Sequence, residues 1–118
     1  MDKIMIRDLA LRTIIGTLPA ERREKQDIVI NLELQTDLTA AGRSDDLNDT
    51  VDYKALKKRI IGRVESSQFL LLERLAAEIA SLCLEEKKIA AVKVTIDKPG
   101  ALRFARSAAV EIFRQQQP

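Results

Sequence analysis

The stretch from Phe69 to Leu84, FLLLERLAAEIASLCL, most limits what this chain can fold into. At 3.6 residues per turn it forms one continuous apolar helix face, made of Leu72, Leu75, Ala76, Ile79 and Leu82. Such a face is stable only when it is packed against a second layer of structure. The segments on either side of this helix should therefore supply that layer.

Glu73 places a charge directly after the apolar run Leu70–Leu72. On the predicted helix it shares a side with Ala76, Ala77 and Ala80, whose small side chains would leave room for a flat ligand. The alternative is an ordinary first-turn acid, stabilised by the positive end of the helix dipole. Periodicity alone favours that alternative, so a ligand-binding role for Glu73 has to be supported by the rest of the chain.

Two segments before the helix have the alternation of β-strands. The clearer one runs from Asp27 to Asp37, with apolar side chains on one face and polar ones on the other. Lys3 to Ile15 reads as a first strand, and a change of parity within it predicts a bulge near Arg7 and Asp8. We expect these two strands to pair antiparallel.

Leu38 to Thr50 is rich in Asp, Ser and Gly and is predicted to be a loop. A first helix should then run from about Asp52 to Glu65, with Asp49 or Thr50 as its N-cap. Its apolar stripe comprises Tyr53, Leu56, Ile60 and Val64.

The two serines Ser66 and Ser67 are predicted to cap the second helix. Beyond that helix, Ile89 to Asp97 reads as a third strand and Ala108 to Arg114 as a fourth. The order is β-β-α-α-β-β, which predicts an α+β fold in a single domain of residues 1–118. We expect a four-stranded antiparallel sheet with both helices on one face. Oligomerisation is the usual way for so small a domain to protect its uncovered sheet face and edges.

Composition excludes several classes of function. Twenty basic and eighteen acidic residues leave a net charge of +2, and aromatic residues are 3%, which argues against a nucleic-acid partner. No apolar run approaches 18 residues and the start lacks the apolar core of a signal peptide, so we expect no membrane partner and a cytoplasmic location. The chain has no histidine, which removes His-based zinc sites and histidine general bases.

Three further residues could take part in chemistry. Lys98 continues the inward parity of the third strand, and burial disfavours a charged ammonium, so such a lysine could act as a base. A strand-end lysine that extends to solvent is an equally good interpretation. Tyr53, the only tyrosine, fits an ordinary core residue better than a catalytic one. Glu21 would normally be a solvated loop acid.

Several spaced motifs resemble those of the dihydroneopterin aldolase family, and the resemblance extends over essentially the whole chain. The matching stretches are Ala20-Glu21, Gln26–Ile30, Asp37-Leu38, Ala40-Ala41, Ser44–Leu47, Thr50–Tyr53, Leu71–Glu73, Leu75–Ala80 and Lys98–Ala101. The resemblance implies the tunnelling fold, in which four subunits join their sheets into a barrel-like ring and two rings commonly stack. It therefore implies a homotetramer or homo-octamer with active sites between subunits.

The resemblance also implies a pterin substrate and roles for five residues. Glu73 would pair with the pterin ring's N–H and amino donors, and the backbone of Leu72 would contact the same ring. Glu21 and Tyr53 would bind substrate, while Lys98, helped by Tyr53, would be catalytic. No cofactor or metal is implied, because the pterin's own imine accepts the electrons when the C1′–C2′ bond of 7,8-dihydroneopterin breaks.

Two stretches, Leu9–Gly16 and Ala101–Ala105, resemble instead the sister enzyme dihydroneopterin triphosphate 2′-epimerase. Under this alternative, Arg103 or Arg106 could contact a triphosphate, although either could equally be a solvated charge on the turn. A third hypothesis is a non-catalytic pterin-binding scaffold.

Overall fold

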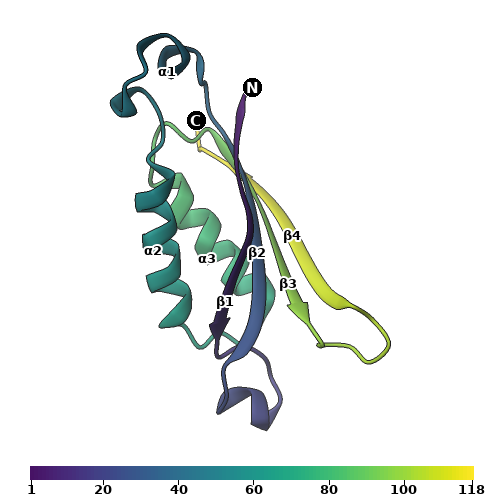
Figure 1. Ribbon diagram of the computed structural model, residues 1–118. Helices are drawn as coiled ribbons and strands as arrows, with labels where there is room; N and C mark the ends of the chain where they lie inside the picture. Colours follow the sequence, from purple (N-terminus) through teal and green to yellow (C-terminus); the bar gives the residue numbers. More distant parts are fainter.

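The computed structural model describes residues 1–118, and it has the predicted β-β-α-α-β-β order of main elements (Figure 1). The strands are β1 (Lys3–Thr13), β2 (Gln26–Gln35), β3 (Ala91–Pro99) and β4 (Ser107–Gln115). The main helices are α2 (Tyr53–Glu65) and α3 (Leu72–Leu84). The strands form one antiparallel sheet in the order β1-β2-β3-β4, so β1 and β4 are its two edges.

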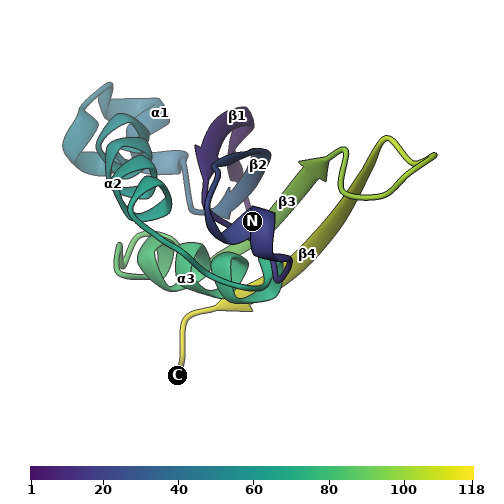
Figure 2. The same ribbon diagram turned by 90° about the horizontal axis from the view of Figure 1, so that it is seen from below.

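Both main helices cover the same face of the sheet, as predicted (Figure 2). The inward side chains of β2 are at most 1% exposed: Ile28, Ile30, Leu32 and Leu34. The apolar face of α3 lies over β3 and β4 and joins the same core through Leu75, Ala76, Ile79 and Leu82, all nearly inaccessible to solvent. Burying each of the larger side chains contributes about 1.5–3 kcal/mol, so this contact sets the position of α3 on the sheet.

The predicted bulge in β1 is confirmed. The pairing of β1 with β2 shifts register between Ile6 and Leu9, and Asp8 has φ = 55°. The backbone N–H of Asp8 donates to Asn31 Oδ1 at 2.9 Å, which satisfies a donor that the ladder leaves free. Without the shift, the apolar side chains after residue 8 would point away from the core.

The prediction of a loop between β2 and α2 is wrong in part. It contains a short helix α1 (Thr39–Ser44) and a 3-10 turn η2 (Leu47–Asp49). The cap of α2 also differs from the prediction, because the side chain of Asp52 accepts from the N–H of Ala55 at 3.1 Å. Asp52 directly precedes the first helical residue, which Asp49 and Thr50 do not.

The prediction that Ser66 and Ser67 cap α3 is wrong. Their hydroxyls donate to carbonyls at the end of α2, Ser66 to Gly62 O at 2.8 Å and Ser67 to Val64 O at 2.7 Å. Both serines therefore satisfy the free carbonyls of the helix before them and leave no hydroxyl aimed at α3. The helix α3 begins later, after Leu71, without a side-chain cap.

The sheet face opposite the helices is charged and uncovered. Glu33 on β2 accepts from Lys3 on β1 at 3.0 Å and from Lys93 on β3 at 2.6 Å. Because Lys93 and Lys3 hold its charged form, the pKa of Glu33 lies below its usual value. These ion pairs join three neighbouring strands across the uncovered face. None of the helices is long and apolar enough to span a membrane.

Candidate functional site

An ion pair between the buried Lys98 and the half-buried Glu21 marks one end of the molecule. Lys98 is the last inward-facing residue of β3 and is 8% exposed, as the strand parity predicted. Its Nζ lies 2.5 Å from Glu21 Oε2 and 3.5 Å from the carbonyl oxygen of Ile15. The structure therefore places Lys98 inside the molecule, and the interpretation of a strand-end lysine extended into solvent is wrong.

Glu21 is held by hydrogen bonds from its own loop and from Lys98 rather than being a solvated acid. It lies on a one-turn 3-10 helix, η1 (Pro19–Arg22), and its Oε1 accepts from the N–H of Leu18 at 3.1 Å. Gln26 donates from Nε2 to Glu21 Oε2 at 3.1 Å and to Ile15 O at 2.6 Å. The hydrogen bond from Lys98, followed by that from Leu18, lowers the pKa of Glu21 from 4.5 to about 2. The carboxylate is therefore ionised at all physiological pH values.

Gly16 makes room for this carboxylate. Its φ of +122° is a backbone conformation that residues other than glycine rarely adopt. A Cβ built on Gly16 would also overlap the carboxylate carbon and both oxygens of Glu21. Glycine is thus required at this position for the Glu21–Lys98 contact to form in this geometry.

Arg22 ties the same loop to the segment that precedes α3. Its guanidinium donates to Gly16 O at 3.0 Å, to Phe69 O at 3.1 Å and to Gln68 O at 2.6 Å. The N–H of Gly16 also donates to Phe69 O at 3.4 Å. The start of α3 is thereby fixed next to the loop that carries Glu21.

Leu72 and Glu73, the first two residues of α3, consequently lie at the same end of the molecule as Lys98 and Glu21. Glu73 is exposed, and none of the chain's ion pairs includes it. It is a first-turn acid, so the helix dipole stabilises its charge whether or not it binds a ligand. Of its predicted small neighbours, Ala76 and Ala80 are buried and Ala77 is half-buried.

Tyr53 lies far from these four residues. It is the first residue of α2, whose opposite end leads to the segment that Arg22 holds (Figure 1). Thirteen residues at 1.5 Å per residue separate the two ends by about 18–20 Å. Tyr53 is 53% exposed, so its predicted place in the apolar stripe of this helix is wrong. One chain therefore brings together Glu21, Lys98, Leu72 and Glu73 but leaves Tyr53 outside.

The loop between β3 and β4 extends away from the sheet (Figure 2). Arg103 and Arg106 are exposed there, and the guanidinium of Arg103 lies 5.1 Å from the centre of the Phe104 ring. Phe104 is 97% exposed and has φ = 71°. Neither arginine takes part in an ion pair within the chain.

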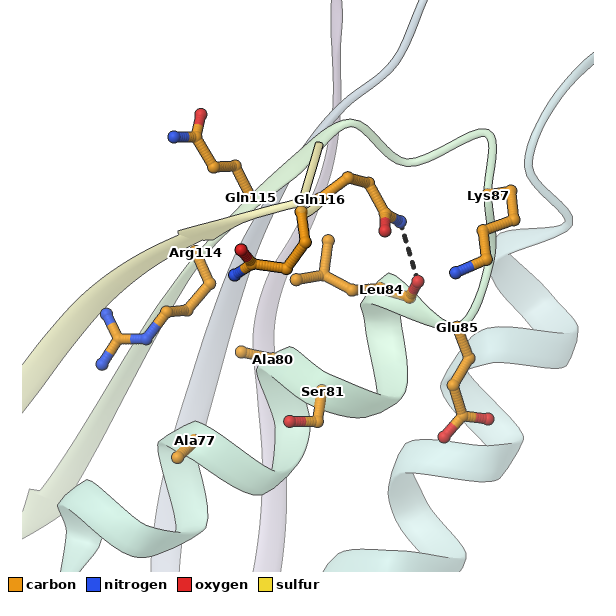
Figure 3. Close-up of a pocket in the computed structure, with 10 residues that line it drawn as sticks. Ala77, Ala80, Ser81, Leu84, Glu85, Lys87, Arg114, Gln115 and Gln116 are labelled. Carbon is orange, nitrogen blue, oxygen red and sulfur yellow. Dashed lines mark hydrogen bonds between the residues drawn. The ribbon is translucent and has the colours of Figure 1, made fainter.

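A separate groove lies between the C-terminal half of α3 and the end of β4 (Figure 3). It has a volume of about 430 Å³, and its walls include Ala77 and Ser81 of the helix and Arg114 of the strand. Gln116 closes one end by donating from Nε2 to Leu84 O at 2.7 Å. This groove runs from Ala77 toward the C-terminal end of α3, and neither Glu21 nor Lys98 lines it.

The sequence reasoning missed Gly16, Arg22 and Gln26 as residues that build the site. Gly16 carried a usable signal, because a glycine directly after an apolar strand often marks a special backbone conformation. Arg22 and Gln26 carried none, because their partners are backbone carbonyls and a carboxylate that only the folded loop brings into reach.

Comparisons with known proteins show which family the chain resembles. Residues 4–113 match the family model described as FolB, dihydroneopterin aldolase. The folic acid synthesis protein FOL1 of Dictyostelium discoideum is 43% identical over 97% of this chain, which spans only 17% of that protein's length. The dihydroneopterin triphosphate 2′-epimerase of Pseudomonas aeruginosa is 38% identical, over 95% of this chain and 91% of that one. The crystal structure of Escherichia coli dihydroneopterin aldolase in complex with neopterin superposes with a TM-score of 0.92 at 33% identity, over 97% of this chain and 99% of that one.

Proposed function

The chain belongs to the dihydroneopterin aldolase family of enzymes, and we propose that it cleaves 7,8-dihydroneopterin into 6-hydroxymethyl-7,8-dihydropterin and glycolaldehyde. The observation that carries this proposal is the ion pair of the buried Lys98 with Glu21, at the same end of the molecule as the unpaired carboxylate of Glu73. A lysine is available there for proton transfer and a carboxylate for ring recognition.

Glu73 and Leu72 would hold the pterin ring. The ring presents an N–H and an amino group side by side, and a carboxylate can accept from both at once. No ion-pair partner within the chain competes with the ring's donors for the carboxylate of Glu73. A bound ring would cover the carboxylate of Glu73, which is exposed in the single chain. A ligand lacking these donors would then leave a buried carboxylate without partners, which is costly, so it would bind poorly.

Lys98 would move the protons of the reaction. The 2′-hydroxyl must lose a proton as the C1′–C2′ bond breaks, and the electrons of that bond pass to the imine of the dihydropterin. The carbon left on the ring then takes up a proton. Lys98 would shuttle these protons, directly or through water. As the neutral amine it would accept the proton of the 2′-hydroxyl, and as the ammonium, held by Glu21, it would return a proton to the carbon. Glu21 would also bind substrate, and Tyr53 would assist the protonation of carbon.

A second copy of the chain must complete the site if Tyr53 takes part. Within one chain the length of α2 separates Tyr53 from Lys98. The free edges of β1 and β4 can pair with other copies, and the uncovered charged face would then line the inside of a closed ring. We therefore propose a homotetramer or homo-octamer with active sites between subunits.

The proposed location is the cytoplasm, which cell fractionation would test.

The second candidate function is epimerisation at C2′ of dihydroneopterin triphosphate. It is favoured by the 38% identity to an epimerase and by the two unpaired arginines on the β3–β4 loop. The two reactions share the first proton transfer and the breaking of the C1′–C2′ bond. They differ in whether the aldehyde fragment then leaves or the bond re-forms on the other face of its carbonyl.

The test incubates purified protein separately with 7,8-dihydroneopterin and with its triphosphate, and separates the products by chromatography. Release of 6-hydroxymethyl-7,8-dihydropterin and glycolaldehyde from the first substrate is the expected result. Inversion at C2′ of the triphosphate without cleavage of either substrate would replace the proposal by the epimerase. No change in either substrate would leave a pterin-binding scaffold.

A further inference from the structure

The surface around Tyr53 carries three lysines without ion-pair partners. Lys54, Lys57 and Lys58 are exposed on the first two turns of α2, and none takes part in an ion pair within the chain. The other two basic residues of this helix are both paired, Arg59 with Glu85 and Arg63 with Glu78. The uncompensated positive charge of α2 is therefore concentrated beside Tyr53.

Two of these lysines face a common pocket. Lys54 and Lys58 are one helical turn apart and line a pocket of about 500 Å³, with Leu47, Asp52, Tyr53 and Ala55 as the other walls. Asp52 is the only acid in it, and its Oδ1 is engaged by the N–H of Ala55. Lys57 does not line this pocket. It lines a different one, of about 300 Å³, together with Lys54, on the side of Tyr53 that faces Met5 and Ile6.

This arrangement of charge is unfavourable for the free chain. Like charges four residues apart on a helix repel each other, and cations near a helix N-terminus oppose the helix dipole. An anion placed between the two ammonium groups would remove both penalties. Phosphate groups match lysine well, because the ammonium acts as a compact point charge with three donors.

We propose that Lys54 and Lys58 bind the phosphates of a phosphorylated 7,8-dihydroneopterin, so that the site favours the phosphorylated substrate over the free triol. The inference rests on the proposed function, because it requires Tyr53 of one copy to enter the site of its neighbour. Tyr53 would then face the reacting side chain of the substrate. A phosphate attached at the end of that side chain reaches past the reacting carbon, and the pocket lined by Lys54 and Lys58 lies next to Tyr53.

The experiment measures kcat/KM for 7,8-dihydroneopterin and for its triphosphate with the wild-type protein and with Lys54→Ala, Lys58→Ala and the double variant. Lys57→Ala is the matched control, since it removes the same charge from the same helix but lies outside the pocket. Arg103→Ala tests the competing basic group on the β3–β4 loop.

We expect each single pocket variant to lose about tenfold in kcat/KM for the triphosphate, the size of one charge-assisted hydrogen bond, through a raised KM. Turnover of the unphosphorylated substrate should stay within about twofold. Added salt should weaken the wild-type preference for the triphosphate and have little effect on the double variant.

Two results would overturn the inference while leaving the proposed function intact. In the first, the ratio of the two kcat/KM values is unchanged in the double variant. In the second, Lys57→Ala or Arg103→Ala lowers the ratio of kcat/KM for the triphosphate to kcat/KM for 7,8-dihydroneopterin as much as the pocket variants do. Failure of the wild-type protein to convert either substrate would remove the proposed function and this inference with it.

Discussion

The ion pair between Glu21 and Lys98 gives the protein a component of stability that depends on pH. The pKa of Glu21 is about 2 in the folded chain and 4.5 in the unfolded one, so folding favours the ionised carboxylate. This contribution is fully present above about pH 4.5 and is lost as the pH falls toward 2. Glu21→Gln removes the titrating group while keeping a side chain of the same size.

The magnitude follows from the shift. A difference of about 2.5 pKa units corresponds to about 3 kcal/mol at pH 7, of which about 1.4 kcal/mol would remain at pH 3. The side chain of Glu21 is 19% exposed, and solvent screening reduces these figures. We therefore expect the free energy of unfolding of the wild-type protein to fall by about 1 kcal/mol more than that of Glu21→Gln between pH 7 and pH 3.

The assay is urea unfolding at a fixed protein concentration and several pH values between 7 and 3. Other carboxylates, such as Glu33 and Glu78, also have lowered pKa values, so only the difference between the two proteins isolates Glu21. Glu24→Gln, a substitution at an exposed acid of the same loop, serves as the control and should follow the wild type. Identical pH dependence in the wild type and Glu21→Gln would refute the reasoning.

Three further predictions concern the same end of the molecule. Gly16→Ala should destabilise the protein by about 2 kcal/mol or more in urea unfolding and reduce turnover, because its Cβ would displace Glu21; unchanged stability would contradict the strain argument. Glu73→Ala should weaken pterin binding about 100-fold in a fluorescence titration, through loss of two hydrogen bonds to a carboxylate, and wild-type affinity would exclude its role in ring recognition. Lys98→Met should bind pterin but lose at least about 100-fold in kcat, and a normal kcat would exclude it as the proton-transfer residue.

Much of the fold could be predicted because the signals are local. The alternation in β2 and the periodicity of α3 each depend only on residues that are close in sequence. The direction of a side chain therefore follows directly from its spacing. The helix boundaries were less accurate. Ser66 can cap a helix on either side of it, and only the position of the chain decides which one.

The sequence by itself determined the element order, the inward faces of the strands, the bulge in β1 and the inward position of Lys98. Only the tertiary structure decided that Lys98 meets Glu21, 77 residues earlier in the chain, and that Tyr53 does not. Periodicity fixes the direction in which a side chain points. The partner it meets depends on the positions of loops and sheet strands that are distant in sequence, and those positions are set by packing of the whole core.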